Sequence, residues 1–383
     1  MTPVELSRTV LRAMRRAVDD GELSGLGDLG GPGDLSDVGV ARRVVVERPR
    51  PGGCGDYATN VALQVARAAG RSPRQVAEVL SPRLAGEPGI AAIDITGPGF
   101  LNITLERGGP QNTGSDSDSG SGSASAALVR DVLSRGASYG HVALAPETTP
   151  GPGEPHHLHF PREVRATVLA DSLRRILESQ GTLVRLTCDE APDPGWDSLG
   201  VHTDAHGKPR AQTETLKTLR PVPAPADPTP LGPDAARWAL LYPAAHDRPR
   251  ISDEHLVQRE ANPLFRVRYA YSRTRALTRN AAALGFTAEP GAIAEPEAQA
   301  LLDALADHPR ILAAAARHRA PDRLARHLVV TADAFLAFQA DVLPLGDEKP
   351  LAAHRARLAL ADAAGTVLAG GLSLLGISAP EFL

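Results

Sequence analysis

Residues 262–281 carry the sequence NPLFRVRYAYSRTRALTRNA, which decides the fold of the C-terminal part of the chain. Its apolar residues recur at steps of three and four, which places them on one face of a helix. The same spacing returns between residues 324 and 342 and again between residues 358 and 372. Several such helices joined by short connections predict an all-α helical bundle over residues 231–383.

The N-terminal part of the chain predicts a different architecture. An amphipathic helix pattern covers residues 4–18, and the turn TGPG at 96–99 separates two β-rich segments, IAAIDI and FLNITL. Ser72 and Pro73 provide the cap and the first turn of a further helix. We therefore expect a small α+β N-terminal domain over residues 1–107.

The middle of the chain has less pattern. Residues 108–127 are rich in Gly, Ser and Asp and predict a flexible Gly/Ser linker. Within residues 128–230, the segment HVALAP at 141–146, a helix that ends at Gly181 and the segment TLVRLTC at 182–188 predict strand–helix–strand. Three elements cannot close a parallel sheet, so we expect a truncated α/β (Rossmann-like) middle domain.

Composition excludes several classes of function. The formal net charge of -4 creates no global field that attracts nucleic acid, so any RNA contact must come from local patches. Cys54 and Cys188 are too few for a disulfide framework or a zinc cluster, and His156, His157 and His159 are expected to lie in a loop without binding metal. No apolar run reaches bilayer length and no signal core is present, which favours a cytoplasmic protein.

A local basic patch is present in the helical part. Residues 259–279 contain six arginines and one acidic residue, Glu260. Arg266, Tyr269 and Arg273 lie at i, i+3 and i+7 and share one helix face. A tyrosine ring can stack on an unpaired base and arginine can pair with phosphate, so this face is a candidate RNA contact; the alternative is a solvated basic face with Tyr269 half-buried. A second basic set, expected to be a solvated helix surface, consists of Arg310, Arg317, Arg319, Arg323 and Arg326.

Three parts of the chain, in this order, resemble the arginyl-tRNA synthetase family, which belongs to the class I synthetases. The family's N-terminal domain, which contacts the tRNA D-loop, is similar to GDYATNVALQVARAAGRSPRQVAEVL at 55–80 and ITGPGFLNITL at 95–105. The passage into its DALR-type anticodon-binding domain is similar to LGPDAARWALL at 231–241 and to residues 262–281. Its C-terminus is similar to LSLLGISAPEFL at 372–383. The resemblance implies a tRNA-binding protein with contacts at both ends of the chain.

The resemblance also assigns roles to individual residues. On the anticodon side it implies contacts by Tyr269, Arg273, Arg266 and Leu383. On the D-loop side it implies contacts by Phe100 and Asn102; the alternative is that Phe100 fills the core and that Asn102 caps a strand end. Arg266 and Leu383 differ from the residues that are usual in the family, so the base preference stays open.

The catalytic signature of the family is altered in this chain. Residues 164–181 resemble the helix that follows the family's His-x-Gly-His signature, where ATP phosphates approach the helix N-terminus and the histidines stabilise developing charge. Here the signature positions hold Phe160, Pro161, Arg162 and Glu163. A shifted alignment that pairs His156 with His159 places Leu158 at the glycine position.

The family's arginine pocket and its Lys-Met-Ser-Lys-Ser-type loop have no visible counterpart, because TLVRLTCDE leads through irregular, Pro-rich sequence to residue 231. We therefore expect no catalytic residue and no cofactor, and interpret the chain as a paralogue that binds arginine-type tRNA without aminoacylating it. One alternative is an arginine–tRNA ligase that uses ATP in an unorthodox or partner-completed active site. Another is a protein-interaction module with a protein partner. Neither a membrane nor DNA is an expected partner.

Overall fold

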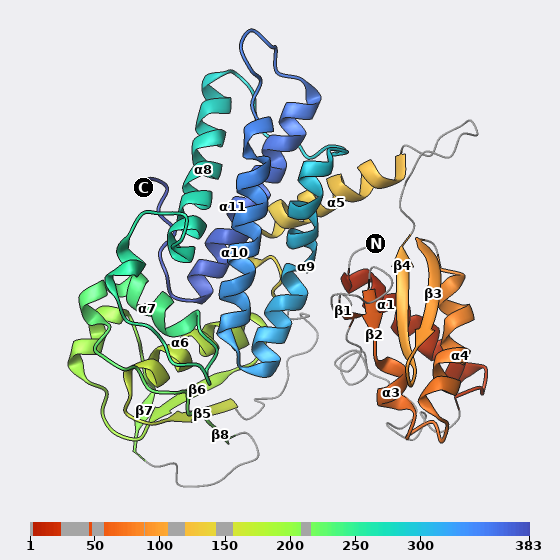
Figure 1. Ribbon diagram of the computed structural model, residues 1–383, viewed down its shortest axis with the longest axis horizontal. Helices are drawn as coiled ribbons and strands as arrows, with labels where there is room; N and C mark the ends of the chain where they lie inside the picture. Colours follow the sequence, from red (N-terminus) through yellow and green to blue (C-terminus); the bar gives the residue numbers. More distant parts are fainter. Residues whose placement is uncertain are drawn as a thin grey trace. The chain divides into compact units, whose positions relative to one another are not determined.

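The computed structural model divides into two compact units, Met1–Asp116 and Ser117–Leu383 (Figure 1). The structure describes residues 3–23, 46–47, 57–87, 89–105, 119–142, 156–207 and 216–383. Cys54, residues 108–118 of the expected linker and residues 143–146 of an expected strand lie outside these ranges. None of the helices in the described ranges is long and apolar enough to cross a membrane.

The N-terminal unit is an antiparallel sheet with helices packed against it. Its strands follow the order β1-β2-β4-β3, and its mixed composition agrees with the predicted helix-and-sheet domain. The strands are β1 Val46–Glu47, β2 Tyr57–Thr59, β3 Ile90–Thr96 and β4 Phe100–Leu105. The helices are α1 Pro3–Asp19, α3 Val61–Val65 and α4 Pro73–Ala85.

The turn between β3 and β4 is held against the beginning of α4. Ser72 and Gln75 form a capping box at the N-terminus of α4, which confirms the predicted helix start. Gly99 has a φ of +134°, and a Cβ atom added there would lie 2.7 Å from the carbonyl oxygen of Pro73. Only glycine tolerates this backbone conformation and this close approach. The contact fixes the position of Phe100, the next residue in the chain.

The second unit contains an all-parallel sheet in the order β7-β6-β5-β8. Its strands are β5 His156–Phe160, β6 Val184–Cys188, β7 Ala205–His206 and β8 Leu216–Thr218. Helix α6, Val164–Ser179, connects β5 to β6. The predicted helix and the strand after it are confirmed, and the parallel pairing of β5 with β6 agrees with the predicted strand–helix–strand order.

The strand before α6 was wrongly located by the sequence pattern. Residues 141–142, the described part of the expected strand, form no strand, and β5 occupies that place in the order of elements. The expectation of loop histidines is therefore also wrong. Leu158 and Phe160 are fully buried, whereas His157 and His159 alternate with them along the strand and so face the other side of the sheet.

The C-terminal part is the helical bundle that the heptad-like spacing predicts. Its helices are α5 Ser119–Arg135, α7 Pro233–Leu241, α8 Pro263–Ala283, α9 Pro296–His318, α10 Pro321–Phe338 and α11 Ala352–Leu374. Short 3-10 turns lie at Gly136–Ser138, Pro194–Leu199, Thr229–Leu231, Asp253–Leu256 and Gln339–Asp341. Figure 1 shows α8, α9, α10 and α11 running side by side along the long direction of the bundle.

Helix α5 corrects the expected linker, because residues 119–127 are helical. Ser125 and Ala126 are buried, and the Ser125 hydroxyl accepts a hydrogen bond of 3.1 Å from the backbone N–H of Ile293. A Cβ atom added to Gly122 would lie 2.6 Å from Cβ of Ala292. The small residues that suggested a linker instead permit close docking of this helix on the bundle.

The boundary expected at residue 230 does not separate two compact units. The sheet, α6 and the bundle share one hydrophobic core, and a buried ion pair crosses the expected boundary. Arg237 of α7 lies 2.7 Å from the carboxylate of Asp171 in α6. Arg237 also donates to the carbonyl oxygens of Leu199 and of Leu375, which follows α11. One guanidinium therefore ties the middle of the chain to the C-terminal bundle.

Candidate functional site

The N-terminus of α6 is capped by the carboxylate of Glu163. Its oxygens accept hydrogen bonds from the backbone N–H groups of Arg165 (3.1 Å) and Ala166 (2.8 Å). A third backbone N–H, that of Ala224, donates to the same carboxylate at 2.9 Å. The open N–H groups and positive dipole end of a helix form a ready anion site. In this chain the carboxylate of Glu163 takes the position that an external anion would occupy.

Arg165, the second residue of α6, closes the same region. Its side chain is fully buried and donates from all three guanidinium nitrogens to backbone carbonyl oxygens, with distances of 2.7 to 3.1 Å. The acceptors are Val222, Leu240, Pro243, Ala244 and Asp247. Burial lowers the pKa of Arg165, and the nearby Glu163 carboxylate opposes that shift. All five N–H groups of the guanidinium find an acceptor, so the arginine holds this loop against α6.

The other altered signature positions have structural roles. Phe160 is fully buried in the core. Arg162 donates to the carbonyl oxygen of Ala191 at 2.9 Å and lies 3.4 Å from a carboxylate oxygen of Asp193. Pro161 lies between them without a side-chain donor. None of the residues at 160–163 can donate from an imidazole to a phosphate.

Two of the three histidines of β5 contact β6 and the residue that follows it. His157 Nε2 lies 2.5 Å from the Thr187 hydroxyl, and His159 Nε2 lies 2.9 Å from a carboxylate oxygen of Asp189. Burial and the nearby positive charge of Arg185 lower the pKa of His157. Within the described ranges, no group of three or more His, Cys, Asp or Glu side chains is placed to hold a metal ion.

The basic patch of α8 is neutralised by acidic groups of the surrounding elements. Four of its arginines make ion pairs, which join Arg266 to Asp333, Arg268 to Asp234, Arg275 to Asp362 and Arg279 to Glu381. Arg273 instead donates to the side-chain oxygen of Gln339 at 3.0 Å. The acids come from α7, α10, α11 and the C-terminal residues. RNA phosphates would therefore have to compete with these internal partners.

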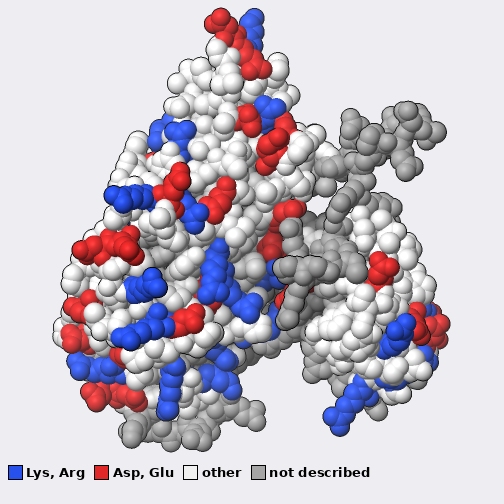
Figure 2. All heavy atoms as spheres, viewed as in Figure 1, with Lys and Arg blue, Asp and Glu red and all other residues white. Residues whose placement is uncertain are grey.

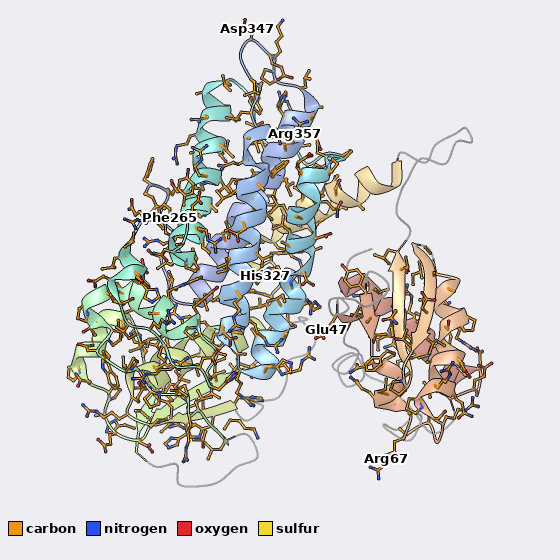
Figure 3. The ribbon with its side chains drawn as sticks, viewed as in Figure 1. Glu47, Arg67, Phe265, His327, Asp347 and Arg357 are labelled. Carbon is orange, nitrogen blue, oxygen red and sulfur yellow. The ribbon has the colours of Figure 1, made fainter. Side chains whose placement is uncertain are left out.

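Tyr269 remains accessible on this helix. Its side chain is 37% exposed, and its ring stacks on Phe265 with centroids 5.5 Å apart and planes 19° apart. Phe265 also lines a cavity of about 250 Å³ together with Asp234, Arg268 and Leu383. Figure 3 shows Phe265 at the outer edge of the bundle. Phe265 was missed in the sequence, although its position one turn before Tyr269 is the spacing of stacked aromatic pairs.

The structure thus brings together only some of the residues predicted for the anticodon side. Tyr269 and Leu383 are connected through Phe265, which touches the ring of one and shares the cavity of the other. Arg266 and Arg273 turn toward α10 and the residues after it, where Asp333 and Gln339 bind them.

The two residues predicted for the D-loop side have different environments. Phe100 is 40% exposed, so it does not fill the core. Asn102 is buried, and its amide donates to the Thr96 hydroxyl at 2.7 Å and to the Asp94 carbonyl oxygen at 3.4 Å. The amide therefore holds the hairpin together, as the structural alternative predicts, while Phe100 presents an accessible ring.

Comparisons with known proteins agree with the order of these parts. Residues 33–105 match the arginyl tRNA synthetase N terminal domain, and residues 267–383 match the DALR anticodon binding domain. An arginine–tRNA ligase of Frankia alni is 29% identical over 567 positions, and one of Paenarthrobacter aurescens is 26% identical over 577; both alignments cover all of each chain. An arginine–tRNA ligase of Clavibacter sepedonicus is 41% identical over 157 residues, which are 39% of this chain and 28% of that protein.

Solved structures give the same relationship at the level of the fold. Thermus thermophilus arginyl-tRNA synthetase superposes with a TM-score of 0.55 at 15% identity, covering 96% of this chain and 100% of the other. The Plasmodium falciparum enzyme gives a TM-score of 0.58 at 10% identity, covering 89% and 95%. Because the alignments with the ligases run over more than 560 positions and this chain has 383 residues, those relatives contain long stretches without a counterpart here. The chain belongs to the arginyl-tRNA synthetase family.

Proposed function

We propose that this protein binds tRNA and does not itself catalyse aminoacylation. The observation that carries the second half of the proposal is the Glu163 carboxylate, which occupies the N-terminus of α6 with three hydrogen bonds. A nucleotide phosphate at that helix end would meet a negative charge, and the N–H groups of Arg165 and Ala166 already have an acceptor. Removing the carboxylate would break three charge-assisted hydrogen bonds, each worth about 1.5–3 kcal/mol.

The small sheet supports the same inference. We infer that β5 to β8 and α6 are a truncated Rossmann-like domain. Their strands are parallel and α6 connects β5 to β6, as at the beginning of such a fold. Strands β7 and β8 have two and three residues, so they provide little edge on which ATP and an amino acid could be aligned. Adenylate formation needs both reactants in a fixed geometry.

The RNA-binding half of the proposal rests on two separate places. In the bundle, the Tyr269–Phe265 stack presents a flat aromatic surface beside several arginines, and stacking on such a surface is worth about 1–3 kcal/mol per base. In the N-terminal unit, Phe100 presents a second exposed ring. The two matched family domains contain these residues. We propose that the RNA is an arginine-type tRNA, which the names of the relatives favour.

The alternative is an arginine–tRNA ligase, and the comparisons favour it over the non-catalytic proposal. The curated relatives that align with the whole chain carry that name. Such an enzyme would use ATP and would need an active site unlike the family's, or one completed by a partner protein. A protein-interaction module without RNA binding is the second alternative.

Two measurements separate these functions. ATP–pyrophosphate exchange with arginine is measured for the purified chain, with and without cell extract; we expect no exchange, and exchange by the purified chain would establish the ligase. Filter binding of total tRNA across a salt series then tests RNA binding, which should weaken as salt rises. No binding at low salt would favour the protein-interaction module. Sequencing of the RNA that co-purifies with the chain tests the preference for arginine-type tRNA.

A further inference from the structure

The connection between α9 and α10 is strongly basic. Residues 317–326, which we call the α9–α10 corner, read RHRAPDRLAR and contain four arginines and one acid, Asp322. Helix α9 ends at His318 and α10 begins at Pro321, so these side chains emerge from one tight corner. Figure 2 shows Lys and Arg atoms gathered over the lower parts of α9 and α10. The sequence alone predicted no more than a solvated helix surface here.

Arg319 has an unusual backbone conformation. It follows α9 with φ 51° and ψ 47°, and its N–H donates to the carbonyl oxygens of Ala315 and Ala316. In the described ranges it is the only non-glycine residue with a positive φ, while every other such position is glycine. This position after a helix usually carries glycine because a Cβ atom is unfavourable there. Glycine would adopt this backbone conformation at lower cost, so the presence of an arginine points to a function of its side chain.

The charges of the corner differ from those of α8. Asp322 is buried and lies 3.4 Å from Arg326, so the single acid of the corner is already paired. Neither Arg319 nor Arg323 makes an ion pair with a described residue, and Arg323 is exposed. An external anion can therefore approach these two guanidinium groups without displacing an internal carboxylate. On α8 the arginines have such carboxylates or, at Arg273, an amide partner.

We propose that the α9–α10 corner binds phosphate groups of the tRNA backbone, as a contact separate from those at Tyr269 and Phe100. The inference rests on the proposed function. Guanidinium groups pair with phosphate oxygens in a bidentate geometry. The corner contains no Phe, Tyr or Trp, and contacts of its guanidinium groups with phosphate would position the RNA without reading its sequence. The corner and Tyr269 belong to the same compact unit, so the fold fixes the distance between the two contacts.

Arg319→Gly gives the sharpest test, because it changes stability and binding in different directions. Glycine relieves the backbone strain, so the thermal unfolding midpoint of the full chain should stay the same or rise. Filter binding of total tRNA should weaken several-fold. The slope of log affinity against log salt concentration should become shallower by about 0.7–0.9, the change for one lost phosphate contact. Arg319→Lys keeps the charge and should retain the slope.

A second variant and a control complete the design. Arg323→Gln should make the slope shallower by the same amount, and the double variant by about twice that amount. Arg130 is an exposed arginine of α5 in the same unit, and Arg130→Gln should change neither affinity nor slope.

The possible outcomes distinguish the two proposals. If the unaltered chain binds no tRNA at low salt, the proposed function is wrong, and the corner proposal, which depends on it, is wrong as well. If the unaltered chain binds tRNA and the double variant binds it with the same affinity and slope, only the corner proposal fails; the corner would then fit an acidic protein surface. Early unfolding of Arg319→Gly would also overturn the inference, because it would show that the arginine serves the fold.

Discussion

Two buried histidines should make the bundle sensitive to mild acid. His308 of α9 and His327 of α10 have ring centroids 5.3 Å apart, and the ring of Tyr139 stacks on His308. Both imidazoles are buried, and Figure 3 shows His327 within the bundle. Nδ1 of His308 and Nε2 of His327 have no hydrogen-bond partner among the described residues. Neutral rings tolerate this environment, whereas protonated rings would lose their hydration without gaining a partner.

The sign and the size of the effect follow from the two pKa values. Burial, followed by the charge of Arg310, lowers the pKa of His327 from 6.5 to about 4, and burial lowers the pKa of His308 well below its ordinary value. Below pH 6.5 the unfolded chain takes up these protons and the folded chain does not. Stability is therefore full above pH 6.5 and falls as the pH drops toward 4. Between pH 7.5 and 5.5 His327 should remove about 1.3 kcal/mol from the free energy of unfolding, and by pH 4 about 3 kcal/mol. His308 should act in the same direction.

Urea unfolding at several pH values measures this effect in the right part of the molecule. Trp196 and Trp238 are the two tryptophans of the chain and both lie in the second unit, so their fluorescence reports its unfolding. His327→Leu should lower the dependence of the unfolding free energy on pH by the share of one histidine, whatever its effect at neutral pH. His202 is exposed, and His202→Gln is the control that should leave the dependence unchanged. An identical pH dependence in His327→Leu and the unaltered chain would refute the reasoning.

Three further predictions concern single contacts. Arg237→Leu removes the closest partner of the buried Asp171 carboxylate, which keeps its ion pairs with Arg174 and Arg175. The free energy of unfolding should therefore fall by about 1–3 kcal/mol in urea titrations, and additional Asp171→Leu should recover part of the loss. Tyr269→Ala should weaken tRNA filter binding by about 1–3 kcal/mol while the free energy of unfolding changes by no more than about 1 kcal/mol. Phe100→Ala should likewise weaken binding without loss of stability, whereas Asn102→Ala should destabilise the N-terminal unit by about 1–3 kcal/mol in thermal unfolding; the opposite pattern would mean that the two roles are exchanged.

Local sequence patterns predicted the helices of the bundle well, because an amphipathic helix records its buried face at steps of three and four residues. Helix α5 was missed because its Gly and Ser residues carry no such record. It is ordered by close contacts such as that between Gly122 and Ala292, which are distant in sequence. Strand β5 was missed for a similar reason. The sequence HHLHF has the composition of a loop, and the strand with which it pairs, β6, is separated from it in the sequence by the whole of α6.

The sequence also predicted only the part of the candidate site that depends on local structure. The positions of Tyr269 and Arg273 on one helix face follow from helical geometry alone. The partners of the α8 arginines do not, because Asp234, Asp333 and Asp362 come from three other helices. A count of local charges therefore overestimated the free positive charge of α8. The hydrogen bond from the Ala224 N–H to the Glu163 carboxylate could not be predicted either, because the two residues are far apart in the sequence.

Both candidate sites contain internal partners, but the two sets differ in strength. The ion pairs of α8 lie at the surface, where such pairs are worth about 0–1 kcal/mol, and RNA phosphates offer each arginine an equivalent acceptor. The Glu163 carboxylate holds three backbone N–H groups, and Arg165 closes the loop around them with five further hydrogen bonds. A phosphate that displaced Glu163 would have to replace those bonds and leave a second negative charge beside itself. Exchange of partners is therefore feasible on α8 and unfavourable at α6, which is why an RNA-binding function is compatible with this chain while nucleotide binding at α6 is opposed.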